Sequence, residues 1–496
     1  MRKSLYFLKN NTHNGKNLRI SYPSADVMYY MLLEQLLRSL SADELAKLRK
    51  ELVLPARSQK IFEYFQNESP APTTRELCGE FGLTKSNLYR LCSEITNECV
   101  SILAISGEFP KLEFFKKKFL VKQFTAELAR TETKLLQEAD ADVLERYYDL
   151  AFTGMMGFPV TQIDMSLVKS YGMKWHLAMR NPPVDHELEI ELRILFIRIG
   201  ALPIWKKMNV DMMRALSRSL LDEVSRRASV TPNPVARYFY YQSEWKAANY
   251  DKVVGKERTK WIERSLEIIA AHESSFPPAS LDTTELQLAY ERAMYCGEIE
   301  VGYERFKRSY CGQVPDTSRN SLFILRYIRL SIMARQFETA KEILGVLEAH
   351  PYVRMTLGIY QPYLHLRSTL HVLEGEIEHA ERLNAISHAL NVDENFFLSY
   401  EVEIRELELI CAYKRNNFEL AELLIARDLK WLQSRKYSLS QSAWPYFYHT
   451  VKACIMYKMT GDKPRPLLRQ HFEELRTTHM ISTMILQNDV DEMYSE

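Results

Sequence analysis

The sequence predicts an all-α protein, and three observations support this fold class. Along most of the 496 residues, apolar side chains recur at the three- and four-residue spacing of amphipathic helices, and polar or proline-containing breaks separate these segments. Glycine accounts for only 16 residues, which leaves few positions for the special turns of many-stranded folds. No sustained period-two alternation is bounded by hairpin turns, so we expect almost no strand.

Composition and charge narrow the class of protein further. Lys and Arg number 65 against 64 Asp and Glu, a net charge of +1, which excludes a uniformly basic nucleic-acid coat but allows a local basic site. The N-terminus lacks a secretory signal and no long window is free of charges, so we expect no membrane segment and no membrane partner. The seven cysteines form no C-x-x-C pair, and this favours a cytoplasmic protein with reduced thiols.

The N-terminal region predicts a basic tail followed by short helices. Residues 1–25 contain five basic residues and no acidic residue, which is typical of a mobile tail or of an arm that touches phosphates. The apolar spacing predicts helices over 25–39 and 56–66, and the capping box Ser41–Glu44 predicts the start of another between them. The prolines of the Ser69–Pro72 segment then interrupt the helices. We therefore expect a helical bundle over residues 26–110.

Within this bundle, residues 73–95 resemble a helix-turn-helix. The capping box Thr73–Glu76 predicts the start of the first helix, and Gly82 stands at the turn, where a positive φ is needed. Thr84 is a suitable N-cap for the second helix. Leu88, Leu91 and Ile95 recur at helical spacing, so we expect them to face the core.

That register turns five side chains of the second helix outward. In a DNA-binding helix-turn-helix the corresponding positions face the major groove, so the resemblance implies contacts to phosphates and base edges. The alternative is a bundle that binds only protein, because residues 57–130 hold 11 basic and 9 acidic residues, a weak surplus for phosphate neutralisation. The candidate nucleic-acid-binding residues here are Lys85, Ser86, Asn87, Tyr89 and Arg90.

Three consecutive lysines follow in a segment expected to form a connecting helix over 111–130. Lys116, Lys117 and Lys118 lie between aromatic residues. One interpretation is a basic patch that grips a nucleic-acid backbone, which adds these lysines to the candidate nucleic-acid-binding residues. The other is an amphipathic helix with its lysines in water.

A short pattern recurs in the C-terminal half at intervals of 38, 40 and 41 residues. Each copy has a large apolar residue, then Glu, and a small residue three positions after the large one. We expect the large residue to fill the turn between two antiparallel helices and the small residue to let the helices approach closely. The large and small residues are Ile299 and Gly302, Phe337 and Ala340, Ile377 and Ala380, and Phe418 and Ala421.

One such helical pair cannot bury its own apolar face, so we expect the pairs to stack into an α-solenoid; a compact irregular helical domain is the alternative. The pattern resembles the tetratricopeptide-like superfamily over about residues 280–460, and more loosely from 130. The period is about 40 residues rather than about 34, and Ile328 and Ser368 stand where the family has glycine. The resemblance implies a TPR-like fold that binds a protein or peptide partner on its concave face.

Catalytic and metal-binding patterns are missing from the sequence. Gly255-Lys256 lacks the rest of a P-loop, and no G-x-G-x-x-G, H-E-x-x-H or G-x-S-x-G occurs. His365, His371 and His379 stand six and eight residues apart, which does not match ligands on adjacent helical turns. Acid pairs such as Glu403 and Glu406 are expected on solvated helix faces. We therefore predict no enzyme activity, no cofactor and no metal.

The sequence thus predicts a non-enzymatic macromolecule-binding protein. One hypothesis is a regulator of transcription whose helix-turn-helix binds double-stranded DNA while the solenoid binds a protein. The other is a protein–protein interaction scaffold without DNA binding. The expected regions are a basic tail (1–25), the helical bundle (26–110), the connecting helix (111–130), irregular helical repeats (131–280), TPR-like repeats (281–480) and an acidic C-terminal tail (481–496).

Overall fold

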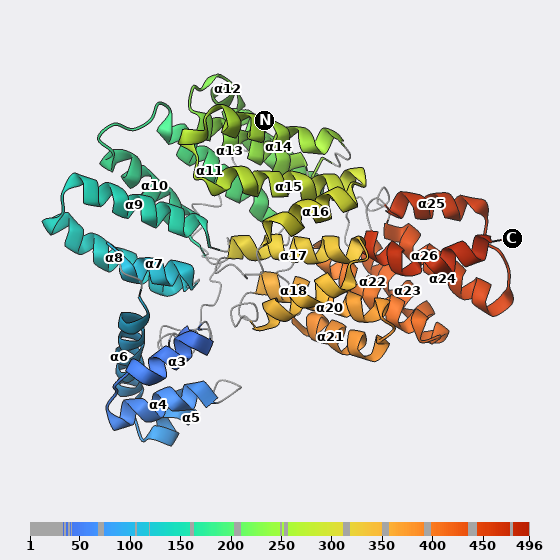
Figure 1. Cartoon of the computed structure of the whole chain (residues 1–496), viewed down its shortest axis with the longest axis horizontal. Helices are drawn as coiled ribbons and strands as arrows, with labels where there is room; N and C mark the ends of the chain where they lie inside the picture. The colour runs from blue at the N-terminus through green and yellow to red at the C-terminus, as the bar shows by residue number, and fades with distance from the viewer. Residues whose placement is uncertain are drawn as a thin grey trace. The chain divides into compact units, whose positions relative to one another are not determined.

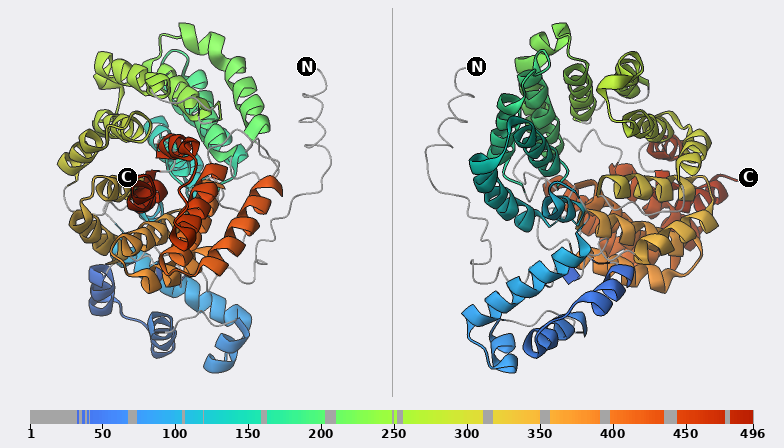
Figure 2. Two further views of the ribbon diagram at one scale, coloured as in Figure 1. Left: turned by 90° about the vertical axis from the view of Figure 1, so that its right-hand side faces the viewer. Right: turned by 60° about the vertical axis from the view of Figure 1, so that its left-hand side comes forward.

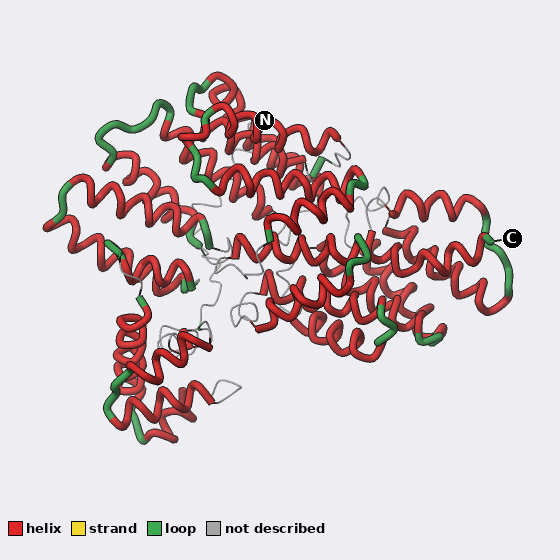
Figure 3. Tube along the Cα trace, viewed as in Figure 1, coloured by secondary structure: helices red, strands yellow, loops and turns green. Residues whose placement is uncertain are grey.

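A computed structural model gives the fold of this chain, and every regular element among the residues it describes is a helix (Figures 1 and 3). This confirms the all-α prediction. The predicted basic tail 1–25 and most of the predicted helix 25–39 lie outside the described residues, as do the cap residues Ser41 and Thr73. The described residues are 33, 36–37, 40, 42–67, 74–104, 107–118, 120–158, 163–202, 210–248, 250–251, 256–310, 318–349, 357–390, 398–434, 444–476 and 480–495.

The chain divides into two compact units, residues 1–127 and 128–496. In the first unit the long helix α6 is the centre, and the helices α3, α4, α5 and α7 all pack against it. Leu77, Leu88 and Ile95 are fully buried there, so α6 is held by its apolar stripe. The helices of this unit are α3 (Ala42–Glu51), α4 (Ala56–Asn67), α5 (Thr74–Phe81), α6 (Lys85–Leu103) and α7 (Pro110–Lys117), followed by α8 (Val121–Glu138), which continues into the second unit.

The segment predicted as one connecting helix, 111–130, contains the end of α7 and the beginning of α8. The N–H of Lys118 donates to the carbonyl of Phe114 at 2.9 Å, and the N–H of Leu120 donates to the carbonyl of Phe115 at 2.9 Å. These bonds close the last turn of α7 in the way that helix C-termini satisfy their free carbonyls. Helix α7 therefore ends at this point, and α8 begins at Val121.

In the second unit, helices that follow one another in sequence pack against one another. Asp140 and Asp164 cap two of these helices by accepting hydrogen bonds from the amides of Val143 and Ser166, at 2.9 and 2.8 Å. The helices before residue 280 are α9 (Ala141–Met156), α10 (Met165–Ala178), α11 (His186–Ala201), α12 (Val210–Val230), α13 (Pro234–Ala248), α14 (Lys256–Ala271) and the 3-10 helix η4 (Glu273–Ser275).

The later helices form pairs, α15 with α16, α17 with α18, α20 with α21, and α22 with α23. Ile299, Phe337, Ile377 and Phe418 are each the first residue of the second helix of a pair, at the turn where the repeated pattern predicts them. The helices are α15 (Ala279–Cys296), α16 (Ile299–Ser309), α17 (Ser318–Met333), α18 (Phe337–Ala349), α20 (Leu357–Leu373), α21 (Ile377–Leu390), α22 (Leu398–Lys414), α23 (Phe418–Ser434), α24 (Trp444–Thr460), α25 (Pro466–Arg476) and α26 (Met480–Tyr494).

The small residues of the pattern lie in the helix contacts. Ala340, Ala380 and Ala421 are fully buried. A Cβ on Gly302 would stand 2.9 Å from the Cβ of Ala293 on α15 and 3.1 Å from the carbonyl oxygen of Ala289. A larger side chain would therefore force the two helices of the pair apart.

The same turn joins the helices of each pair. The residue two positions before the second helix is left-handed in every copy: φ is 75° at Gly297, 57° at Arg335, 82° at Gly375 and 57° at Asn416. In three copies the residue after the left-handed one donates its N–H to the carbonyl of the residue five positions before it. For example, Gln336 donates to Ser331 at 2.8 Å. This is the hydrogen bonding of a glycine-type helix C-cap, so a non-glycine residue at the turn carries strain.

We expect Arg335→Gly to raise the free energy of unfolding by about 0.5–1 kcal/mol, because it relieves a strained left-handed residue, and Gly375→Ala to lower it by about 1 kcal/mol. Arg335 is exposed, and no atom lies within 4 Å of a Cβ on Gly375, so packing contributes little to either change. Urea unfolding followed by circular dichroism measures both. Asn416→Gly serves as control with a smaller gain, because Asn tolerates this conformation; destabilisation by Arg335→Gly would contradict the account.

Residues 481–496, predicted as an acidic tail, lie mainly in helix α26. Its apolar side chains are buried, with Leu486 fully inaccessible and Met493 1% exposed. α26 packs against α24 and α25, and also against α17, α20 and α22 (Figure 2). The segment is rich in acidic residues, as the sequence shows, but its apolar side chains are buried and hold it against other helices.

No described helix combines the length and the apolar character that a membrane crossing requires. The described cysteines are free thiols. Cys92 and Cys454 are buried in helix contacts, and burial raises the pKa of each to about 12. These cysteines act as small apolar side chains.

Candidate functional site

The α5–α6 turn is the most regular local feature of the first unit. Gly82 has a φ of 57°, and the N–H of Leu83 donates to the carbonyl of Cys78 at 2.9 Å. Thr84 then caps α6 by accepting from the amide of Asn87 at 3.3 Å. Arg57 on α4 donates to the carbonyls of Phe81 and Gly82 at 2.8 and 3.1 Å. The turn therefore has a defined C-cap, a defined N-cap and a side chain that holds it to α4.

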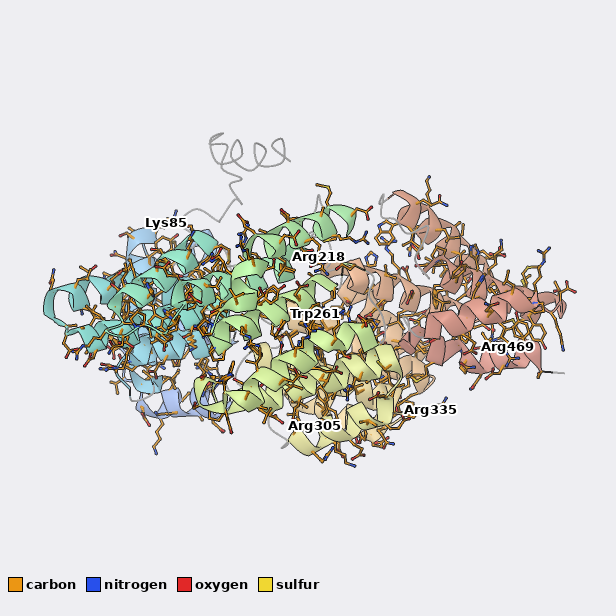
Figure 4. The ribbon with its side chains drawn as sticks, turned by 90° about the horizontal axis from the view of Figure 1, so that it is seen from above. Lys85, Arg218, Trp261, Arg305, Arg335 and Arg469 are labelled. Atoms are coloured by element: carbon orange, nitrogen blue, oxygen red, sulfur yellow. The ribbon has the colours of Figure 1, made fainter. Side chains whose placement is uncertain are left out.

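The first two turns of α6 expose the predicted polar side chains. Lys85, Ser86, Asn87 and Arg90 are exposed, whereas Tyr89 is half-buried. Figure 4 shows Lys85 at the outer edge of the helices, pointing outward. Behind this face Leu88 is fully buried and Leu91 is half-buried. The exposed end of α6 thus presents two cations, a hydroxyl and an amide to the surroundings.

Two of these side chains have partners within α6. The Nη1 atom of Arg90 lies 2.6 Å from Oε1 of Glu94, with both side chains more than half exposed. The ammonium of Lys85 lies 5.9 Å from the centre of the Tyr89 ring. Exposed contacts of this kind are worth about 1 kcal/mol or less, which is weak enough for an anionic ligand to compete with them.

The three lysines of residues 116–118 are half-buried rather than fully solvated. The ammonium of Lys118 lies 2.6 Å from Oε2 of Glu44, and the Lys118 side chain is 9% exposed. This pair joins the end of α7 to the beginning of α3. Lys118 therefore has a structural partner, which sets it apart from the exposed cations of α6.

In the second unit a partly buried network of charged residues connects α17, α20 and α22, which are the first helices of three successive pairs. Arg329 on α17 donates to Oε1 of Glu403 on α22 at 2.7 Å. Nε2 of His365 on α20 lies 3.4 Å from Oε2 of the same carboxylate. Glu406, one turn further along α22, is fully buried and accepts a hydrogen bond from the hydroxyl of Ser482 on α26 at 2.7 Å.

The prediction that Glu403 and Glu406 lie on a solvated face is therefore wrong. Helix α22 has apolar residues around its whole circumference between Val402 and Tyr413, which is typical of a helix buried on several sides. Charged residues inside such a helix must be paired. This all-round apolar pattern is the signal from which the network could have been found.

Burial lowers the pKa of His365, and the positive charge of Arg329 lowers it further, although Glu403 and Glu406 act in the opposite direction. The folded state therefore favours the neutral imidazole. A histidine in the unfolded chain titrates near pH 6.5, so the stability that this group contributes is complete above that pH and is lost as the pH falls below it.

We expect the melting temperature of the protein to fall between pH 7 and pH 5, and His365→Gln to make this fall shallower. Burial also lowers the pKa of His186. This histidine therefore also lowers the melting temperature as the pH falls, and it is still present in the His365→Gln variant. Differential scanning calorimetry across this pH range measures the slope. His379→Gln is the control, because this side chain is 63% exposed; an unchanged slope in His365→Gln would contradict the assignment.

One turn between paired helices gathers three side chains that could hold a metal ion. His371, Glu376 and His379 offer ligand atoms that all lie within 4.8 Å of one another. Oε2 of Glu376 is 2.7 Å from Nδ1 of His371 and 3.6 Å from Nδ1 of His379. We predicted no metal site because the spacing of the histidines does not fit ligands on adjacent turns of one helix. In the structure these residues lie on both sides of the left-handed turn at Gly375, which brings them together. The Glu376 carboxylate already has one close partner in the group, the ring of His371.

Two segments rich in aromatic residues, 238–241 and 446–448, contribute side chains to the core and to the surface. Phe447 and Tyr448 are fully buried, and Tyr238 is 7% exposed. Tyr241 lines a pocket of about 180 Å³ between α13 and α14 together with Arg237, Arg264, Glu267 and His272. A carboxylate among these cations leaves the pocket with mixed charge.

Comparison with known proteins finds no matching family model, no similar curated protein and no similar solved structure.

Proposed function

We propose that this chain is a non-enzymatic DNA-binding regulator of transcription that acts in the cytoplasm. Helices α5 and α6 form a helix-turn-helix whose second helix enters the major groove. The helical pairs of the second unit form a TPR-like α-solenoid that binds a protein or peptide. DNA recognition and partner recognition thus belong to different units of the chain.

The observation that carries this proposal is the division of α6 into two faces. Lys85, Ser86, Asn87 and Arg90 are exposed at its N-terminal end, while Leu88 and Ile95 are buried. Exposed N-terminal residues of the second helix are those that contact base edges in this type of motif. An Asn can pair with adenine and an Arg with guanine. Lys118 is not part of the proposed interface, because it pairs with Glu44.

Binding of the full chain to a random duplex DNA, followed by fluorescence anisotropy over a series of salt concentrations, tests this function. Binding with an affinity that falls steeply with salt supports it, because each neutralised phosphate releases counterions. Absence of binding at low salt would overturn the DNA-binding role.

The second candidate function is a protein–protein interaction scaffold without DNA binding. The pairing of Arg90 with Glu94 favours this alternative, because it places an acidic group beside one of the two cations of α6. A partner that copurifies with the chain, together with no DNA binding at low salt, would support it.

A further inference from the structure

The C-terminal helix α26 contacts several of the helical pairs. It packs against α17, α20 and α22, the first helices of three successive pairs. In the left view of Figure 2, α26 is the dark red helix beside the C label. Each of those pairs already packs on its sequence neighbours, so α26 adds a further layer across helices that are distant in sequence.

The contact has an apolar part along one side of α26. Ile481, Ile485, Leu486, Val490 and Met493 are each at most 6% exposed. Asp491, on the opposite side of the helix, is exposed. α26 thus buries one side against neighbouring helices, as helices bound in grooves do.

The contact also has a charged part, centred on Asp489. Its carboxylate accepts a hydrogen bond from the hydroxyl of Tyr413 at 2.9 Å and from the ammonium of Lys414 at 2.6 Å. The ammonium of Lys458 on α24 lies 2.9 Å away. Burial alone would raise the pKa of Asp489, but hydrogen bonds from Lys414, Lys458 and Tyr413 outweigh it and lower the pKa. Three donors from two helices therefore form a clamp for a single carboxylate.

We propose that the surface formed by α17, α20 and α22, with the clamp of Tyr413, Lys414 and Lys458, is a receptor for an amphipathic helix carrying a carboxylate, and that α26 is its exchangeable occupant. The partner is a helix with an apolar stripe spaced like that of α26 and an Asp or Glu at the position of Asp489. Such a helix binds by displacing α26. This inference rests on the proposed protein-binding role of the second unit.

The test uses the full chain with a protease site inserted between Arg476 and Met480, cleaved after folding. A fluorescein-labelled peptide with the sequence of residues 480–496 is the probe, and anisotropy measures its entry into the cleaved protein. We expect saturable binding to the cleaved protein and binding at least about tenfold weaker to the uncleaved protein, because a tethered α26 competes at high effective concentration.

Two variant peptides test the clamp. We expect Asp489→Lys to weaken binding at least about tenfold, because a cation would face two lysines. Asp491→Lys is the matched control, since Asp491 is 52% exposed and lies 3.9 Å from Arg469; we expect it to change affinity less than about threefold.

Failure of the labelled peptide to enter the cleaved, folded protein would overturn the proposal, and so would unfolding on cleavage, since α26 would then be a permanent part of the core. Equal binding of the two variant peptides would also overturn it. DNA binding measured on the same cleaved sample reports separately on the proposed function, because the α5–α6 turn lies in the other compact unit.

Discussion

Replacing Lys85 and Arg90 together by glutamate is expected to lower the affinity for duplex DNA at least about a hundredfold. Two cations that would face phosphates or guanine are lost, and two anions take their place. The slope of log K against log salt should also fall in magnitude by about two. Anisotropy titrations at several salt concentrations measure both quantities.

The double variant should remain folded. Lys85 is the first residue of α6, where an acidic residue interacts favourably with the helix dipole. Arg90→Glu replaces the exposed pair with Glu94 by two like charges at i and i+4, and each of these effects costs less than about 1 kcal/mol. A change in DNA affinity would therefore report on the interface rather than on the fold.

Lys50→Glu combined with Lys60→Glu is the matched control. Both lysines are exposed, on α3 and α4, and the pair changes the net charge by the same amount. We expect this control to weaken binding by less than about tenfold, through long-range electrostatics alone. Equal losses in the two double variants would show that the exposed end of α6 does not contact DNA.

The largest effect on stability is expected for Asp428→Ala, which should lower the free energy of unfolding by about 3–5 kcal/mol. The Asp428 side chain on α23 is fully buried, 2.8 Å from Nη1 of Arg405 on α22 and 2.7 Å from Nε of Arg427. The Arg405 guanidinium also lies 4.3 Å from the centre of the Trp431 ring. Removal of the carboxylate takes this ion pair away from the Arg405 side chain, which is only 13% exposed.

Urea unfolding followed by circular dichroism measures this change. Glu378→Ala is the control, because Glu378 on α21 also pairs with an arginine from another part of the fold, Arg415 in the turn after α22, at 3.1 Å, but is 71% exposed. We expect the control to cost less than about 1 kcal/mol. A similar cost for both variants would contradict the account, because it would remove the distinction between a buried and an exposed ion pair.

The local features of this fold could be predicted from the sequence. The four large residues of the repeated pattern, such as Phe337 and Ile377, begin second helices, and the turn at Gly82 and Thr84 has the expected caps. These features depend on residues within one or two helical turns of each other, and helical spacing and capping describe interactions over that range.

The tertiary structure decided the features that depend on distant residues. Lys118 meets Glu44 across 74 positions, and Ser482 meets Glu406 across 76. The position of α26 against α17, α20 and α22 follows from the path of the helical pairs through space. Helical periodicity identifies the apolar side of a helix such as α26 but not the surface that covers it, because that surface is assembled from segments far apart in the chain.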